Sequence, residues 1–474
     1  MSDPFVVVGG DAAGLSAASK CKREAPDRDV IVYEKGDWIS YAHCGMPYYV
    51  KGEVDSIGDL LSLSPAEVRE RGIDLHRNHE VLAVDPERQR VRAASEDGTV
   101  EQSYGDLLVA TGARAVTSPI EGTDLDDVFT MHHMQSAARL RAFLTPPEAA
   151  DDSALDAGYV DLKDVGAYFD REPPESVAIV GGGYVGVEMA EAFRGWDLDT
   201  HLYQRSGRPA PPFGEAVGEA ITDTLADAGV DLHLNTAVEA LDGDERVQRV
   251  VAADGTVDVD CVLVGIGIRP NTGLLAGTGV EFGESGAVSI DEYGRTAVDG
   301  IYAAGDCAEN VHTVTGEPDW VPLGLTANRA GRAVGQTVAG TPEPVGEIAG
   351  TAVLKAFELE CGRTGIIDHE RAREAGFDPV SETITAGSRS GYYPGNAETT
   401  VTVVADRASG RLLGGTIAGE DRAAVRVDTL AAAVHEGTTV GELERFDLAY
   451  APPFSPVWDP ILVAAKVLNG HLDG

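Results

Sequence analysis

The stretch FVVVGGDAAGLSAASKCKRE, residues 5 to 24, decides the fold of the first part of the chain. Its β-branched run predicts a strand that ends at Gly9, and helix-forming residues begin near Ala12. Gly9 permits a tight turn, Gly14 lets the helix pack close to the strand, and the helix N-terminus faces a pyrophosphate. Asp11 stands where the usual pattern has a second glycine, so the chain departs from the full fingerprint there.

The segment that follows completes a dinucleotide-binding unit. VIVYEK, residues 30 to 35, predicts a second strand. Glu34 lies twenty residues after Gly14, where a carboxylate binds a ribose hydroxyl. Strand, glycines, helix, strand and acid in this order predict a Rossmann-like fold.

The same pattern recurs in SVAIVGGGYVGVEMAEAF, residues 176 to 193. After another β-branched strand, the glycines have full GxGxxG spacing at Gly181, Gly183 and Gly186. The chain therefore contains two dinucleotide-binding units.

The second unit differs from the first at the end of its second strand, in THLYQRSGR, residues 200 to 208. Gln204 and Arg205 stand where an NAD site has an acid, and Arg208 follows. Loss of the carboxylate and gain of arginine suit a 2′-phosphate, which favours NADPH over NADH.

Two further motifs are typical of a protein that combines two dinucleotide-binding units. LLVATGARA, residues 107 to 115, and GIYAAGDCAE, residues 300 to 309, each predict a strand that ends in a small-residue turn. Asp306 in the second turn can accept hydrogen bonds from a sugar-like chain such as the ribityl of a flavin. With two such folds, we expect FAD in one and a nicotinamide cofactor in the other. The expected cofactor-binding residues are Gly9, Gly10, Gly14, Glu34, Lys35, Thr111, Gly112, Gly181, Gly183, Gly186, Arg205 and Asp306.

The composition limits the class of protein further. At 474 residues the chain is too long for one core, so two or three domains are expected. It has 37 Lys and Arg against 78 Asp and Glu, a net charge of −41. A nucleic-acid binder needs basic faces, so no such partner is expected. Molar salt would screen this charge within about 3 Å, which favours a halophilic, haloarchaeal source.

Other segments carry weaker signals. The Pro-, Ala- and Asp-rich stretch at 145–158 predicts an exposed linker or an insertion. No eighteen-residue apolar run and no signal pattern occur, which predicts a cytoplasmic protein without a membrane partner.

Five cysteines occur, and none belongs to a CxxC pair or to a cluster with zinc spacing. No disulfide framework and no metal site are therefore predicted. Cys21, Cys261 and Cys361 are interpreted as small buried hydrophobic residues. Cys44 is different, because SYAHCGMPYYVKG, residues 40 to 52, predicts an irregular turn rather than a core strand or helix.

Together these motifs resemble the pyridine nucleotide-disulfide oxidoreductase family. Within it, the chain is similar to the single-cysteine branch of coenzyme A disulfide reductases and related NADH oxidases. The resemblance covers nearly the whole chain. It is carried by the two fingerprints, ATGAR (110–114), GIGIRPN (265–271), YAAGD (302–306), AYAPPFSPVWDP (449–460) and Ser40-x-x-x-Cys44-Gly45-x-Pro47-Tyr48.

The resemblance implies an α/β fold with two Rossmann-like domains and a C-terminal α+β dimerisation domain. It places a discontinuous FAD-binding domain at 1–145 and 265–339, an NAD(P)H-binding domain at 146–264 and the dimerisation domain at 340–474. It also implies a homodimer whose active sites lie between the subunits.

The missing second cysteine shapes the expected chemistry. Without a neighbouring thiol, Cys44 cannot cycle through an internal disulfide, but it can hold a mixed disulfide with a small thiol or a sulfenic acid. A flavin reduced by the nicotinamide cofactor would cleave that bond and leave a thiolate for the next substrate.

The first helix suggests what the small thiol is. Ser16, Lys20 and Arg23 share one helix face, and four of the seven lysines (20, 22, 35 and 51) fall in this part of the chain. Such a patch could hold the phosphates of coenzyme A. The resemblance agrees and implies coenzyme A contacts at Ser16, Lys20, Arg23, Ser40, His43 and, less directly, Arg71.

The resemblance also assigns residues of the C-terminal domain. It implies that Tyr392 and Tyr450 approach the partner subunit's cysteine as hydrogen-bond donors, with Tyr393 as an alternative to Tyr392. Trp458 is expected to line the same pocket, and Glu188 resembles the acid near the nicotinamide.

The leading hypothesis is an NADPH-dependent flavoenzyme, with NADH possible, that reduces coenzyme A disulfide to two coenzyme A. An NAD(P)H oxidase that uses a Cys44 sulfenic acid and a coenzyme A-dependent persulfide or polysulfide reductase are the nearest alternatives. γ-Glutamylcysteine disulfide is a rival substrate. A flavoprotein that passes electrons to a ferredoxin is the alternative from another class, and it would not need Cys44.

Overall fold

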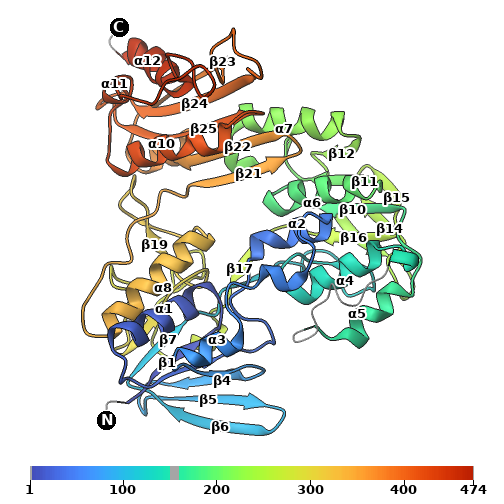
Figure 1. Ribbon diagram of the computed structural model, residues 1–474, viewed down its shortest axis with the longest axis vertical. Coiled ribbons are helices and arrows are strands. Elements are labelled where there is room, and N and C mark those ends of the chain that lie inside the picture. Colours follow the sequence, from blue (N-terminus) through green and yellow to red (C-terminus); the bar gives the residue numbers. More distant parts are fainter. Residues whose placement is uncertain (1–2, 150–159, 473–474) are drawn as a thin grey trace.

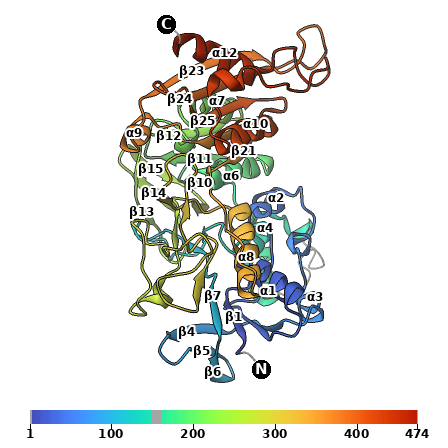
Figure 2. The ribbon, with the colours of Figure 1, turned by 90° about the vertical axis from the view of Figure 1, so that its left-hand side faces the viewer.

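The computed structural model describes residues 3–149 and 160–472. Residues 150–158 of the expected linker lie outside this range, while its first residues end in a short 3₁₀ turn, η3 (Pro147–Ala149). Within the described ranges no helix is long and apolar enough to cross a bilayer. Three five-stranded sheets organise the described chain (Figures 1 and 2).

The first sheet has the order β18-β7-β1-β2-β3, and every pairing in it is parallel. Helices α1 (Ala12–Glu24) and α8 (Gly324–Val338) lie side by side over this sheet (Figures 1 and 2). Because β18 comes from residue 301 onward, the chain leaves this sheet and returns to it. Its strands are β1 (Phe5–Val8), β2 (Val30–Tyr33), β3 (Asp74–His76), β7 (Asp106–Val109) and β18 (Ile301–Ala303).

Smaller elements surround the first sheet. Short helices carry the chain from β2 to β3, and an antiparallel three-stranded sheet follows β3. These elements are η1 (His43–Gly45), α2 (Met46–Lys51), α3 (Pro65–Glu70), β4 (Glu80–Asp85), β5 (Arg90–Ser95) and β6 (Gly98–Ser103).

The second sheet has the order β12-β11-β10-β16-β9 and is also parallel. Its strands are β9 (Val128–Phe129), β10 (Ser176–Val180), β11 (Asp199–Gln204), β12 (Val230–Leu234) and β16 (Cys261–Val264). Its helices are α4 (Met134–Leu144), α5 (Leu162–Phe169), α6 (Tyr184–Gly195) and α7 (Glu215–Asp227). A meander of β13 (Val238–Asp242), β14 (Arg249–Ala252) and β15 (Gly255–Asp258) adjoins it.

The chain passes from the first sheet to the second before residue 145, the expected end of the first segment of the FAD-binding domain. Strand β9 pairs with β16 of the second sheet, and Met134 and Leu144 of α4 belong to the same core as Val177 of β10. Strand pairing therefore favours a boundary before β9, with α4 on the nicotinamide side. Two short strands, β8 (Ala113–Ala115) and β17 (Ile268–Pro270), pair where the chain passes between the sheets.

The third sheet is antiparallel, with the order β21-β22-β25-β24-β23. It lies at the top in Figure 1, and its loops project at the upper right in Figure 2. Its strands are β21 (Ala352–Ala356), β22 (Leu359–Gly365), β23 (Pro379–Gly387), β24 (Glu398–Asp406) and β25 (Leu412–Gly419). The helices are α9 (His369–Glu374), α10 (Ala423–His435), α11 (Val440–Leu443) and α12 (Pro460–Leu472). A small pair, β19 (Asn310–Val311) and β20 (Pro318–Asp319), precedes α8.

A buried carboxylate on α6 joins elements from all three parts. Glu191 accepts hydrogen bonds from Lys51 Nζ at 2.6 Å, Lys355 Nζ at 3.0 Å and the Phe357 amide at 2.8 Å. Burial alone would raise the pKa of Glu191, but the hydrogen bonds from the two lysines lower it below its ordinary value.

We expect Glu191→Gln to lower the free energy of unfolding by about 2 kcal/mol, because two ammonium groups lose their shared counter-charge. The difference from wild type should vanish as the pH falls below 4.5, where the wild-type carboxylate becomes protonated. Urea unfolding at several pH values measures it. Glu53→Gln is the matched control, because Glu53 pairs with the same Lys51 from an exposed position and should contribute less than about 1 kcal/mol. Equal effects of the two variants would refute this account.

Candidate active site

A large open cavity of about 3250 Å³ lies at the carboxyl ends of the strands of the first two sheets. Sites for single small ligands usually measure about 300–1,000 Å³, so this cavity has room for more than one extended ligand. Most of the predicted site residues line it: Gly9, Gly10, Glu34, Lys35, His43, Cys44, Thr111, Gly112, Gly181, Gly183, Glu188, Arg205 and Asp306.

The first glycine turn forms a cradle with no room for side chains. Gly9 has a φ of 110°, and a Cβ atom there would lie 2.1 Å from the Ala110 carbonyl oxygen. A Cβ atom at Gly14 would lie 1.9 Å from the Gly9 carbonyl oxygen, so α1 packs directly on the turn. The Gly10 amide donates to Glu34 Oε2 at 2.7 Å. Burial raises the pKa of the Glu34 carboxyl.

The second glycine turn repeats this geometry with a neutral side chain in place of the acid. A Cβ atom at Gly186 would lie 1.9 Å from the Gly181 carbonyl oxygen. The Gly182 amide donates to Gln204 Oε1 at 3.1 Å, as the Gly10 amide does to Glu34. Arg205 lines the cavity beside this turn, whereas Arg208 lies 3.5 Å from Glu215.

Cys44 lies in the 3₁₀ turn η1, just before α2, and is exposed to the cavity. Partial burial by surrounding protein atoms raises the pKa of the Cys44 thiol, and the negative charges of Glu188 and Asp306 raise it further. Burial also raises the pKa of Asp306. The single chain therefore favours an uncharged sulfur at this position. The predictions that Cys21, Cys261 and Cys361 are buried are confirmed, and Cys307 is buried as well.

Asp11 holds the loop that carries Cys44. Its Oδ1 accepts from the Tyr41 amide at 3.1 Å, and its Oδ2 lies 2.5 Å from His43 Nε2. The His43 ring stacks on Tyr41 with centroids 4.2 Å apart. The residue that departs from the glycine fingerprint thus connects the start of α1 to the cysteine loop. Sequence reasoning noted the departure but missed this role.

We expect Asp11→Gly, which restores the glycine, to loosen residues 40–45. Loss of both contacts should speed amide hydrogen exchange there by about tenfold, because each hydrogen bond to a charged group contributes about 1.5–3 kcal/mol and part is regained from water. Exchange mass spectrometry of the peptide that contains Cys44 measures this. Asp27→Gly, in the exposed turn after α1, is the control. Unchanged exchange at Tyr41 and His43 in Asp11→Gly would contradict the assignment.

Glu188, on α6, is the second carboxylate near Cys44. Burial raises its pKa to about 7. Tyr48 Oη donates to Glu188 Oε1 at 3.4 Å, and burial followed by Glu188 raises the pKa of the Tyr48 hydroxyl. Glu188 therefore changes charge near neutral pH, beside the thiol.

In the reduced protein at pH 8, iodoacetamide should alkylate Cys44 about three- to tenfold faster in Glu188→Gln than in wild type. At this pH the wild-type carboxylate of Glu188 is ionised, and its negative charge raises the pKa of the Cys44 thiol. Below pH 6 the two rates should converge, because Glu188 is then neutral in both proteins. Parallel rate–pH profiles would show that Glu188 does not act on the thiol.

Seven residues were predicted to contact the substrate. In the single chain His43 lines the cavity, and Ser16, Lys20, Arg23, Ser40, Arg71 and Trp458 lie outside its lining, so their contacts with coenzyme A stay a prediction. Lys20 is 6% exposed and pairs with Glu24 at 2.5 Å. Ser16 Oγ donates to Asn328 Oδ1 at 2.7 Å. Arg71 donates to Ser19 Oγ at 3.4 Å.

The four lysines of this part of the chain each have a partner within the single chain. Lys22 donates to the carbonyl oxygens that follow α1, and Lys35 pairs with Glu80. Lys51 pairs with Glu191 on the second Rossmann-like unit. The ammonium group of each of these lysines is paired with an acid or a carbonyl oxygen, as expected in so acidic a chain.

The C-terminal aromatic residues lie away from this cavity. Tyr392, Tyr450 and Trp458 do not line it, and all three are exposed, Tyr392 at 77%. Tyr393 also lies outside the cavity lining, and its amide donates to the Ser390 carbonyl at 2.8 Å. Within one chain, these side chains do not meet Cys44.

Comparisons with known proteins agree with this architecture. A family model described as pyridine nucleotide-disulphide oxidoreductase matches residues 3–325, and the model of that family's dimerisation domain matches residues 351–460. The chain is 38% identical over 474 residues to an NAD(P)H coenzyme A polysulfide/persulfide reductase of Pyrococcus horikoshii, with 99% of each chain covered. It is 28% identical to a coenzyme A disulfide reductase of Staphylococcus aureus, over 95% of this chain and 96% of that one. The structure of an NAD-dependent persulfide reductase from A. fulgidus is similar, with a TM-score of 0.91, 30% identity, and coverage of 99% of this chain and 84% of that chain.

Proposed function

This chain belongs to the pyridine nucleotide-disulphide oxidoreductase family, and we propose that it reduces sulfur–sulfur bonds linked to coenzyme A through the single thiol of Cys44. At the level of the family it is a flavin-dependent NAD(P)H oxidoreductase with a dimerisation domain. The observation that carries the proposal is one exposed cysteine in the lining of the cavity, with Cys21, Cys261, Cys307 and Cys361 all buried.

The first glycine turn fits FAD. A Cβ atom at Gly9 or Gly14 would overlap backbone, so glycine is what allows the turn and α1 to pack this closely. The Gly9–Gly10 turn and the start of α1 line the cavity, where an extended pyrophosphate could bind at the helix N-terminus. Glu34 is oriented by the Gly10 amide, and we propose that it holds the ribose. Asp306 lines the same cavity, and its carbonyl oxygen accepts from Trp320 Nε1 at 2.8 Å, which fixes its turn. FAD supplies the relay that carries an electron pair from the nicotinamide to the sulfur–sulfur bond.

The second glycine turn fits a nicotinamide dinucleotide, and we propose NADPH as the preferred one. Gln204 occupies the acid's position without a charge that would repel a 2′-phosphate. Arg205 lines the cavity next to it. The preference is measured as the ratio of kcat/KM values for NADPH and NADH, and Arg205→Ala should lower that ratio.

The proposed cycle balances with one thiol. The Cys44 thiolate attacks one sulfur of coenzyme A disulfide, which forms the Cys44–coenzyme A mixed disulfide and releases one coenzyme A thiolate. Two electrons from NAD(P)H and one proton then cleave this bond, release the second coenzyme A and restore the thiolate.

The electrostatics around Cys44 support a resting mixed disulfide. Glu188 and Asp306 raise the pKa of the thiol, so they disfavour a free thiolate relative to an uncharged disulfide. A further hydrogen-bond donor or positive charge near the sulfur would stabilise a thiolate formed in the cycle. We propose that the exposed Tyr392 and Tyr450 of a second subunit donate that hydrogen bond in a homodimer.

The proposal allows two classes of sulfur substrate, coenzyme A disulfide and a coenzyme A persulfide or polysulfide. Coenzyme A disulfide suits the mixed-disulfide cycle directly. A coenzyme A persulfide or polysulfide is favoured by the higher identity to the Pyrococcus reductase, 38% against 28% for the disulfide reductase. We propose the same Cys44 chemistry for both, with the terminal sulfur released as hydrosulfide in the persulfide reaction.

The test is anaerobic NADPH consumption by the FAD-loaded protein in high salt, with either substrate added. Two thiols per NADPH from coenzyme A disulfide would establish disulfide reduction. Hydrosulfide released only when polysulfide and coenzyme A are both present would establish the persulfide reaction. Consumption that starts only when air enters would instead establish an oxidase and overturn the proposal.

A further inference from the structure

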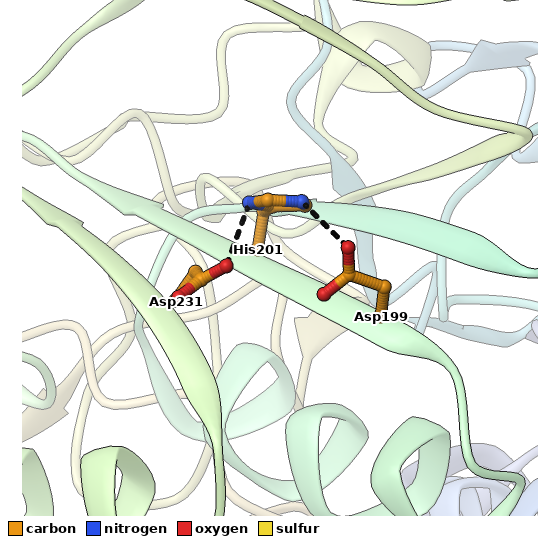
Figure 3. Close-up of side chains that lie close together, drawn as sticks. All are labelled: Asp199, His201 and Asp231. Carbon is orange, nitrogen blue, oxygen red and sulfur yellow. Dashed lines mark ion pairs between the residues drawn. The ribbon is translucent and has the colours of Figure 1, made fainter.

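An unassigned cluster of imidazoles and carboxylates lies on the second sheet, where β11 pairs with the edge strand β12. Figure 3 shows His201 of β11 between Asp231 of β12 and Asp199 of β11, with one carboxylate near each ring nitrogen. His233 of β12 and Asp254, which follows β14, complete the group. None of these five side chains has a part in the proposed sulfur chemistry.

The two imidazoles face each other at a separation that suits a shared metal ion. His201 Nδ1 lies 3.3 Å from His233 Nε2. Two nitrogens bound to one tetrahedral Zn²⁺, each at about 2.0–2.1 Å, lie about 3.3–3.4 Å apart. Without an ion, the two nitrogens share a single hydrogen atom. Asp231 Oδ2 also lies near the first of these nitrogens, at 3.7 Å from His201 Nδ1.

The far nitrogen of each imidazole faces its own carboxylate. Asp199 Oδ2 lies 3.6 Å from His201 Nε2, and Asp254 Oδ2 lies 3.2 Å from His233 Nδ1. The Asp254 contact is a hydrogen bond, and it keeps the hydrogen on His233 Nδ1 and leaves Nε2 free to bind a metal, whereas Asp199 lies just beyond hydrogen-bond distance. The Tyr203 ring stacks on His233, with centroids 4.1 Å apart and planes 10° apart, which fixes the ring orientation.

We propose that His201 Nδ1, His233 Nε2 and the Asp231 carboxylate bind a divalent transition-metal ion of the Zn²⁺ class, with Asp199 and Asp254 orienting the two histidines. Two imidazole nitrogens select such ions over Mg²⁺ and Ca²⁺, which prefer oxygen ligands alone. Asp199 and Asp231 are about two-thirds exposed, so an ion can enter from solution and water can complete the coordination.

The ion would link the edge strand β12 to the neighbouring strand β11. In the register of this pair, His201 lies opposite Asp231 and Tyr203 lies opposite His233. The ligands therefore come from two residue pairs of the ladder that are separated by the pair Leu202–Leu232, so they lie on the same face of the sheet. Spacing along the sequence did not predict this site, because its ligands come from two strands about thirty residues apart and become neighbours only through parallel pairing.

The test is Zn²⁺ retention by the FAD-loaded protein, first stripped with a chelator and with Cys44 blocked by iodoacetamide so that the exposed thiol does not compete. Equilibrium dialysis in about 1 M KCl with excess Mg²⁺ suppresses binding to scattered surface carboxylates. We expect one Zn²⁺ per chain in wild type. His201→Asn and His233→Asn should each weaken binding by at least tenfold, and Asp254→Asn by about tenfold.

His471→Asn is the matched control, because His471 is a single imidazole paired with one carboxylate, Glu382, at 3.2 Å. It should retain Zn²⁺ as wild type does. Zn²⁺ should also raise the thermal midpoint of wild type and of His471→Asn, but not that of His233→Asn. No Zn²⁺ retained by wild type, a result that depends on no variant, would overturn the proposal. Equal retention by His201→Asn, His233→Asn and His471→Asn would overturn it as well.

Discussion

Cys44→Ser is expected to lower kcat/KM for coenzyme A disulfide or persulfide by about 10⁴-fold while the protein still binds FAD and NADPH. A serine hydroxyl neither attacks a disulfide sulfur nor forms a bond to it that two electrons can cleave. Cys44 lines the cavity without supporting the core, so the exchange should leave the fold and the bound flavin unchanged. Anaerobic NADPH oxidation with the sulfur substrate measures the loss, and flavin absorbance measures cofactor content.

A second cysteine variant separates this effect from a general loss of thiols. Cys361→Ala removes a thiol that is buried in the third sheet, on β22. Its activity should stay within about threefold of wild type, at a stability cost of about 1 kcal/mol. If Cys44→Ser kept its sulfur-dependent activity, Cys44 would not form the mixed disulfide, and an electron carrier that needs no thiol would be the better interpretation.

Gly14→Ala should abolish retention of FAD and lower the free energy of unfolding by about 3 kcal/mol. The added methyl would lie 1.9 Å from the Gly9 carbonyl oxygen and 3.0 Å from the Gly9 carbonyl carbon, so backbone and not a flexible side chain must move. Helix α1 would shift away from the turn that receives the pyrophosphate. The ratio of flavin to protein absorbance after gel filtration, together with urea unfolding, measures both effects.

Gly166→Ala is the control for Gly14→Ala, because it makes the same substitution inside a helix, α5, where no atom of residues 3–149 or 160–472 outside the helix's own backbone lies within 4 Å of the new Cβ atom. Higher helix propensity should make this variant as stable as wild type or more stable by about 0.5–1 kcal/mol. Full FAD content in Gly14→Ala would show that the turn tolerates displacement, and the fit of FAD to this cradle would need another explanation.

The two Rossmann-like units were predictable because their determinants are local. The strand before Gly9, the helix after Ala12 and the acid at Glu34 follow one another within about thirty residues, and the structure places them as expected. The point near β9 where the chain passes to the second sheet was harder to predict from the sequence. Only its pairing with β16, more than 130 residues later in the chain, shows that it belongs to the second sheet.

Residues of the candidate site could be predicted where they belong to a local sequence motif. Residues whose role depends on charge pairs between distant parts of the chain could not. Cys44 and Glu188 share the cavity, although 144 residues separate them, because each follows a turn with a recognisable pattern. Clustering of lysines along the chain does not show which acid each ammonium group meets after folding. Lys51, for example, pairs with Glu191. The roles of Asp11 and His201 likewise depend on contacts between separate elements.

The most direct test of the central claim is the mass of the oxidised protein after incubation with coenzyme A disulfide, mapped to the peptide that contains Cys44. We predict one coenzyme A per chain in disulfide linkage at Cys44, removed by NADPH under anaerobic conditions with release of one coenzyme A thiol. An unmodified Cys44 in a protein that still oxidises NADPH, or coenzyme A on another cysteine alone, would contradict the proposal.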